Sequence, residues 1–128
     1  GYAYNKSIGE MLRLVPVSDS LLVTNDFRYP ANNFDRDFLH MTLPSLFGHQ
    51  WYAVNYVYYR FGLDADDIHH RMVKQKELLG GDRIRLLKYA DQHGWTHYLE
   101  RISEAPSRNN YLTLIAENSE YRLYAFPR

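Results

Sequence analysis

The sequence of 128 residues contains no cysteine. This absence excludes disulfide bonds and thiolate-ligated metal centres, and it removes cysteine as a catalytic nucleophile. It does not locate the protein, because a domain without cysteine is at home in reducing and oxidising compartments alike.

An excess of charge of either sign is also lacking, since fifteen basic side chains balance fifteen acidic ones. A nucleic-acid binder needs a positive field, and this chain does not supply one. Two predicted helices, 67–80 and 83–93, are joined by Gly80-Gly81 in the manner of a helix-turn-helix, but acidic neighbours offset their basic residues. We expect no nucleic-acid partner.

No apolar run approaches the ~20 residues that a membrane helix needs. A signal-peptide pattern is missing too, and the chain opens on Gly1-Tyr2 rather than Met. We therefore expect residues 1–128 to form a single soluble α/β domain, excised from something longer.

The sequence lacks the usual motifs for nucleophilic catalysis or phosphate binding, namely G-x-S-x-G, G-x-G-x-x-G and the Walker loop. His93 and His97 are four residues apart, but Gly94 separates them and they do not share a helical face. His69 and His70 are adjacent and point in different directions from a helix. We predict no catalytic residue, no metal and no cofactor.

Asp64 begins a segment that resembles a calcium-binding loop. The sixth and twelfth positions of such a loop need Gly and Glu, but here they hold His69 and Gln75. The acidic residues favour a helix N-terminus instead.

Apolar periodicity and turn residues predict the secondary structure. Ser7 to Glu10 fits a capping box that begins a helix, Pro16 ends the helix, and an apolar strand follows at 20–25. The other predicted elements are a strand at 50–56, helices at 64–81 and 82–94, and strands at 95–102, 111–116 and 121–126. The inner faces of the two long helices are predicted to be Ile68, Met72, Gln75 and Leu79, and Ile84, Leu87, Ala90 and Asp91.

This order of elements predicts an α/β fold, a single layered domain with a mixed, Rossmann-like sheet of about five strands flanked by helices. Ligands in such folds bind beyond the carboxyl ends of the strands. Asn25 and Asp26 end the first strand and act either as a general base or ribose ligand, or as an Asx turn; we favour the turn. The candidate ligand-binding residues are Asn25, Asp26, Arg28, His49 and Arg60.

Twelve tyrosines are the one unusual abundance. Tyrosine combines an apolar ring with a polar tip, so it suits half-buried sheet faces and interfaces. We favour packing at the sheet over the alternative, a surface that binds sugars or lipid headgroups.

Six short motifs in order resemble the soluble C-terminal domain of polytopic GT-C-type membrane glycosyltransferases, which use lipid-linked sugar donors. A short helix precedes a strand, then come an aromatic turn with proline, a Gly-basic-aromatic passage, a Gly-aromatic strand and a closing strand pair. In this chain the strand after the short helix is 20–25, the aromatic turn is 27–30, and the Gly-basic-aromatic passage is 43–52. The Gly-aromatic strand is 94–99, and the closing strand pair is 112–118 and 121–126.

The resemblance implies a non-catalytic accessory domain on the extracytoplasmic (periplasmic) face of a membrane, which helps to bind an acceptor or a partner. In that family the catalytic acid lies on a loop between membrane helices, and no position here matches it. The implied partners are the membrane portion of the parent chain and a glycan or lipid-linked acceptor.

Two alternatives stay open. One is a free-standing small-molecule-binding or enzymatic α/β domain with Asn25, Asp26 and Arg28 at the strand end. The other is a protein–protein interaction module that uses the tyrosines.

Overall fold

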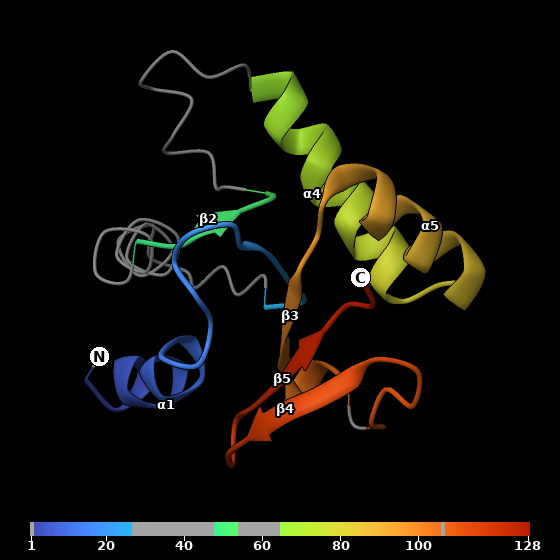
Figure 1. Ribbon diagram of the computed structural model, residues 1–128. Coiled ribbons are helices and arrows are strands. Elements are labelled where there is room, and N and C mark those ends of the chain that lie inside the picture. The colour runs from blue at the N-terminus through green and yellow to red at the C-terminus, as the bar shows by residue number, and fades with distance from the viewer. Residues whose placement is uncertain (1, 27–47, 54–64, 106) are drawn as a thin grey trace.

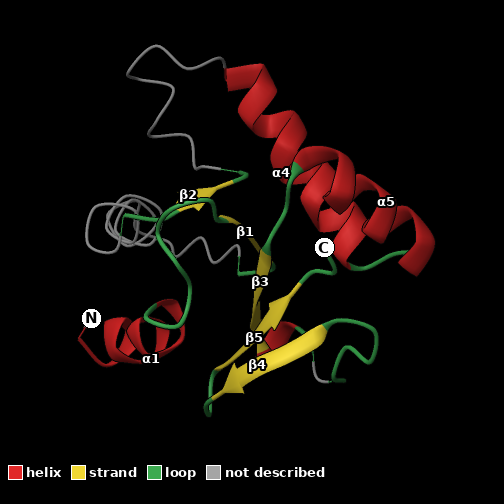
Figure 2. Cartoon of the chain, in the orientation of Figure 1, coloured by secondary structure: helices red, strands yellow, loops and turns green. Residues whose placement is uncertain are grey.

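The computed structural model describes residues 2–26, 48–53, 65–105 and 107–128 (Figure 1). Figure 2 shows the helices and strands along this part of the chain. In chain order they are α1 (Tyr2–Leu12), β1 (Leu21–Thr24), β2 (Gln50–Trp51), α4 (Ala65–Leu79), α5 (Arg83–His93), β3 (His97–Arg101), the 3₁₀ turn η3 (Ile102–Glu104), β4 (Thr113–Glu117) and β5 (Tyr121–Ala125).

The strands form one open, mixed sheet in the order β2-β1-β3-β5-β4. β1 lies between β2 and β3 and is parallel to both, whereas β5 is antiparallel to β3 and to β4. The predicted α/β class and the mixed five-stranded sheet are therefore confirmed. The predicted likeness to a Rossmann sheet stays a prediction. The part of the sheet to which it applies is the set of three parallel strands, β2, β1 and β3.

Helices cover both faces of the sheet (Figure 1). Successive strand residues point to opposite faces, so Val23 and Tyr98 face α4 and α5, whereas Leu22 and Leu99 face α1. Two apolar clusters result, one on each face. Buried tyrosines belong to both clusters: Tyr52, Tyr98 and Tyr124 on the α4–α5 face, and Tyr121 on the α1 face.

The start and end of α5 follow from its flanking residues. The Asp82 carboxylate accepts a hydrogen bond from the Arg85 amide at 3.1 Å, which caps the first turn. Gly94 ends the helix with φ of 72°, a left-handed conformation that other residues adopt at a cost.

The predicted inner face of α5 is wrong at Ile84, which is 74% exposed, and at Asp91, which is also exposed. The buried residues are Leu86 and Ala90, which are four positions apart and share one face. Ile84 lies about 200° around the helix from Leu86, given roughly 3.6 residues per turn, and so it points away from the core.

The predicted capping box is also wrong, because α1 begins at Tyr2 and includes both of its residues. The Ser7 hydroxyl donates to Glu120 Oε1 at 2.8 Å, and Asn118 Nδ2 donates to Glu10 Oε2 at 3.1 Å. These side chains tie α1 to the turn between β4 and β5. The apolar side chains of Ile8, Met11 and Leu12 in α1, and of Val15 just beyond it, are all buried.

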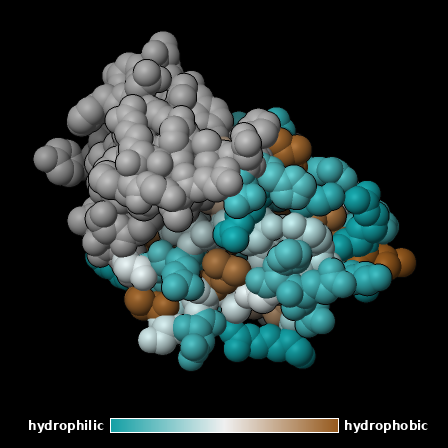
Figure 3. All heavy atoms as spheres, turned by 90° about the horizontal axis from the view of Figure 1, so that it is seen from above, coloured by the Kyte–Doolittle hydropathy of each residue, from teal (hydrophilic) through white to brown (hydrophobic). Residues whose placement is uncertain are grey.

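Some predicted features lie outside the described residues, including the aromatic turn at 27–30, the first part of the passage at 43–52 and the end of the strand at 50–56. The described surface in the view of Figure 3 is mainly hydrophilic, with hydrophobic residues in separate spots. Among the helices of the described residues, none combines the length and apolar character needed to cross a membrane.

Candidate functional site

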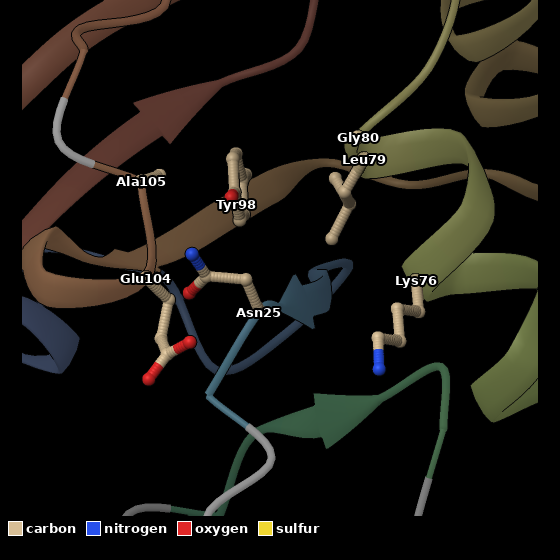
Figure 4. Close-up of a pocket in the computed structure, with 7 residues that line it drawn as sticks. All are labelled: Asn25, Lys76, Leu79, Gly80, Tyr98, Glu104 and Ala105. Atoms are coloured by element: carbon tan, nitrogen blue, oxygen red, sulfur yellow. The ribbon is translucent and has the colours of Figure 1, made fainter.

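A cleft of about 270 Å³ lies at the carboxyl ends of β1 and β3 (Figure 4). These neighbouring strands are parallel, so their ends meet at the edge where α/β folds commonly bind ligands. The end of α4 forms one side of the cleft, and the segment that follows β3 forms the other. The lining residues are Asn25, Lys76, Leu79, Gly80, Tyr98, Glu104 and Ala105.

Asn25 joins the two strands at the base of the cleft. Its Oδ1 accepts a hydrogen bond from the Arg101 amide at 2.7 Å, and its Nδ2 donates to the Arg101 carbonyl at 3.3 Å. The side-chain amide thus takes the place of a backbone partner and extends the pairing of β1 with β3. Both of its polar atoms are engaged in holding the fold.

Asp26 turns away from solvent and is 3% exposed. Its Oδ2 accepts a hydrogen bond from the Tyr121 hydroxyl at 2.7 Å. Its backbone amide donates to Thr24 Oγ1 at 3.1 Å, and the Thr24 hydroxyl donates to the Leu99 carbonyl at 2.7 Å. Asp26 therefore links the end of β1 to the beginning of β5 on the α1 side of the sheet.

Gln75 fixes α4 against the end of β1. It is 1% exposed, and its Nε2 donates to the Thr24 carbonyl at 3.0 Å. The predicted inward direction of Gln75 is confirmed. Its neighbour Lys76 lies in the last turn of α4 and reaches the cleft.

A buried ion pair supports the opposite side. Arg122 Nη1 donates to Glu100 Oε1 at 2.9 Å and to the Ala105 carbonyl at 3.0 Å. The Tyr124 hydroxyl donates to the same Glu100 oxygen at 3.2 Å. Because Ala105 lines the cleft, this network sets the position of that wall.

Electrostatics keep the network in one protonation state. The hydrogen bond to Glu100 outweighs burial and raises the pKa of the Arg122 guanidinium, so it remains charged. Burial, followed by the negative charge of Glu100 and a hydrogen bond to it, raises the pKa of the Tyr98 hydroxyl. Tyr98 therefore presents a neutral, protonated side chain to the cleft.

His49 does not join Asn25 and Asp26. Leu21 pairs with Gln50 in the parallel register, which places His49 at the amino ends of the strands, the opposite edge of the sheet. It is 5% exposed, and its Nε2 donates to the Val15 carbonyl at 2.8 Å. Arg28 and Arg60 lie outside the described residues.

Two more polar side chains are buried near His49, at the amino ends of β1 and β3. Ser20 is buried directly before β1, and His97 is the first residue of β3. His97 Nδ1 lies 2.8 Å from Thr96 Oγ1. Burial, then the charges of Arg128 and His49, lower the pKa of His97, so its neutral form is favoured.

Sequence reasoning did not identify Lys76, Tyr98 or Glu104 as site residues. Lys76 and Glu104 stand in ordinary polar segments that carry no motif. The ion pair left a clearer signal, because Glu100 and Arg122 are charged residues within two predicted strands. Charges of opposite sign in two such strands indicate that the strands are neighbours.

Comparison with known proteins adds no relative: no protein-family model, no curated protein and no solved structure matches this chain.

The arrangement suits binding. In the described part of the chain, no group of three or more His, Cys, Asp or Glu side chains has a geometry for a metal ion. The cleft instead joins an apolar back, formed by Leu79, Tyr98 and Ala105, to the charged side chains of Lys76 and Glu104. Ligand sites typically combine an apolar lining with a few polar groups in this way.

Proposed function

We propose that this chain is a non-catalytic accessory domain of a membrane-bound, GT-C-type glycosyltransferase-like protein. It lies on the extracytoplasmic face, and its cleft at the carboxyl ends of β1 and β3 helps to bind an acceptor or a partner. The sequence resemblance supports the part of this proposal that concerns the parent protein. The cleft supports the part that concerns binding.

One observation carries the binding role: the polar groups best placed for chemistry are already engaged within the fold. The Asn25 side chain is hydrogen-bonded to the Arg101 backbone. The Asp26 carboxylate accepts a hydrogen bond from the Tyr121 hydroxyl and is almost completely buried. A general base must reach its substrate within hydrogen-bond distance. The cleft beside these residues keeps exposed side chains on its rim, which suits a ligand that is held and not transformed.

The first test is the reading frame that encodes the parent protein. Several hydrophobic spans ahead of Gly1 in the same frame are expected. A complete reading frame of about this length, with no such spans, would contradict the membrane assignment and favour the free-standing α/β domain. That alternative draws support from the same cleft, which lies where α/β enzymes bind substrates.

The second test is kinetic and uses the whole parent enzyme. Replacing Lys76 by Gln and Glu104 by Gln is expected to raise KM for the acceptor and to leave kcat unchanged, because only binding is affected. Lys88→Gln, an exposed change on α5, serves as the control. A fall in kcat with unchanged KM would contradict a non-catalytic role for the cleft.

A further inference from the structure

The two exposed charges on the cleft have opposite signs and lie on opposite sides of it. Lys76 comes from the last turn of α4, and Glu104 comes from η3. Figure 4 shows Asn25 between them, with Tyr98 and Leu79 above in this view. The two side chains form no ion pair with each other, and both line the cleft.

The Lys76 ammonium forms no ion pair with any residue in the described ranges, and the side chain is exposed. Its position at the helix C-terminus is favourable for a cation, but that interaction is with the helix as a whole. The ammonium group therefore keeps its hydrogen-bond donors for a bound anion.

Among the described residues, the Glu104 carboxylate pairs with Arg101, whose Nη1 lies 3.6 Å from Oε1. The Glu104 side chain is 54% exposed, and a contact of this length at the surface contributes little. The carboxylate can accept further hydrogen bonds from a bound cation.

Asn25 and Tyr98 shape the cleft without competing for the ligand's charges. Both polar atoms of Asn25 bind the Arg101 backbone, and the raised pKa of the Tyr98 hydroxyl keeps that side chain neutral. What remains between the two charges is an apolar surface and a space of about 270 Å³. This is slightly below the range of roughly 300–1,000 Å³ for drug-sized sites, so the ligand is small.

We propose that the cleft binds a small zwitterion, with its ammonium group at Glu104 and its phosphate or carboxylate group at Lys76. The inference rests on the proposed binding function and names the class of ligand. A simple cation or anion satisfies one side of the cleft and leaves the other charge without a partner. A zwitterion satisfies both sides, which is the electrostatic complementarity that gives specificity.

The experiment is a titration of the isotope-labelled chain followed by amide NMR. The probes are glycerophosphoethanolamine, which carries both charges, and its two halves, ethanolamine and dimethyl phosphate. We expect the zwitterion to shift the amides of Gly80, Glu104 and Ala105 and to bind about tenfold more tightly than either half, a difference of about 1.4 kcal/mol.

Single substitutions of Lys76 and Glu104 test which charged group of the zwitterion each residue binds. Lys76→Gln is expected to weaken the zwitterion to the level of ethanolamine, and Glu104→Gln to weaken it to the level of dimethyl phosphate. Lys88→Gln should leave the affinity unchanged, because Lys88 is an exposed residue of α5 that does not line the cleft. Equal affinity for all three probes, or no effect of either cleft variant, would overturn the inference.

Two further measurements are needed. One distinguishes a lipid headgroup from a free molecule as the source of the ligand, and the other distinguishes failure of the zwitterion inference from failure of the proposed function. Co-sedimentation with phosphatidylethanolamine vesicles supports a lipid headgroup, whereas binding of the soluble probe alone supports a free molecule. If neutral disaccharides shift the same amides and the zwitterion does not, the zwitterion inference fails and the proposed function stands. If no probe shifts them, both fail.

Discussion

The buried polar groups at the two ends of the parallel strands differ in whether they have hydrogen-bond partners. At the carboxyl ends, two buried polar side chains have partners from other elements: Gln75 donates to the Thr24 carbonyl, and Asp26 accepts a hydrogen bond from Tyr121. At the amino ends, Ser20 Oγ and His49 Nδ1 are buried, and neither has a hydrogen-bond partner among the described residues.

The difference indicates where stability resides. An intramolecular hydrogen bond makes a net contribution of about 0.5–1.5 kcal/mol to stability, whereas an unpaired buried polar group lowers stability by about 1–3 kcal/mol. We infer that the carboxyl-end contacts stabilise the fold and form a rigid frame for the cleft. The unpaired amino-end groups weaken it, and the lowered pKa of His97, also at the amino ends, makes it sensitive to pH.

The largest expected effect is the loss of the ion pair that supports the cleft wall. Glu100→Ala leaves the Arg122 guanidinium buried without its main partner, and this should lower the free energy of unfolding by about 3–5 kcal/mol. Urea unfolding followed by circular dichroism measures the loss. The exposed Glu104→Ala is the control and should change stability by less than about 0.5 kcal/mol.

The same ion pair allows a second comparison. Glu100→Leu combined with Arg122→Met removes both charges, so the double variant should recover most of the stability lost in Glu100→Ala. A double variant less stable than the single one would show that the network contributes more than the avoidance of an unpaired charge.

Asn25→Ala comes next in size. It removes two hydrogen bonds to the Arg101 backbone and should cost about 1–3 kcal/mol. Asn25→Asp keeps the acceptor for the Arg101 amide but loses the donor, so an intermediate loss is expected. Hydrogen exchange of the Arg101 amide provides a local measurement, and the exposed Asn110→Ala should leave its protection unchanged.

Much of this frame could be predicted from the sequence. The run at 20–25 is apolar and ends in polar residues, so strand β1 and its polar edge were visible. The caps Asp82 and Gly94 act on their own helix, and α5 therefore appeared with correct bounds. Such signals are local, because the residues that determine each element lie within a few positions of it.

The cleft could not be predicted, because it depends on contacts between distant parts of the chain. Asn25 and Arg101 are 76 positions apart, and nothing near Asn25 indicates that its amide pairs with a backbone. His49 and Asn25 both flank predicted strands, and from the sequence alone we expect both in the same candidate binding site. The parallel register of β1 and β2, which the sequence does not reveal, places them at opposite edges.

At the amino ends, His97 should make stability depend on pH. Burial lowers its pKa below the ordinary value of 6.5, so the unfolded chain takes up a proton first as the pH falls. The contribution is complete above about pH 6.5 and is lost as the pH falls from there through the lower pKa of the folded state. The slope is at most about 1.4 kcal/mol per pH unit for one proton.

Urea unfolding at pH 7.5 and pH 5.5 measures this dependence. In His97→Gln the difference between the two pH values should shrink, because the titrating group is gone. His93→Gln is the matched control, since His93 is exposed at the end of α5. An equal difference in the wild type and in His97→Gln would assign the pH dependence to other groups.

The smallest effect tests the comparison most directly, with one hydroxyl from each end of β1. Thr24→Val removes the bond to the Leu99 carbonyl and the acceptor of the Asp26 amide, and should cost about 1 kcal/mol. Ser20→Ala removes a buried hydroxyl that has no partner among the described residues, so stability should stay within about 0.5 kcal/mol or rise. Equal losses in the two variants would show that the Ser20 hydroxyl is also bound in solution, and that the two ends of the strands do not differ as described.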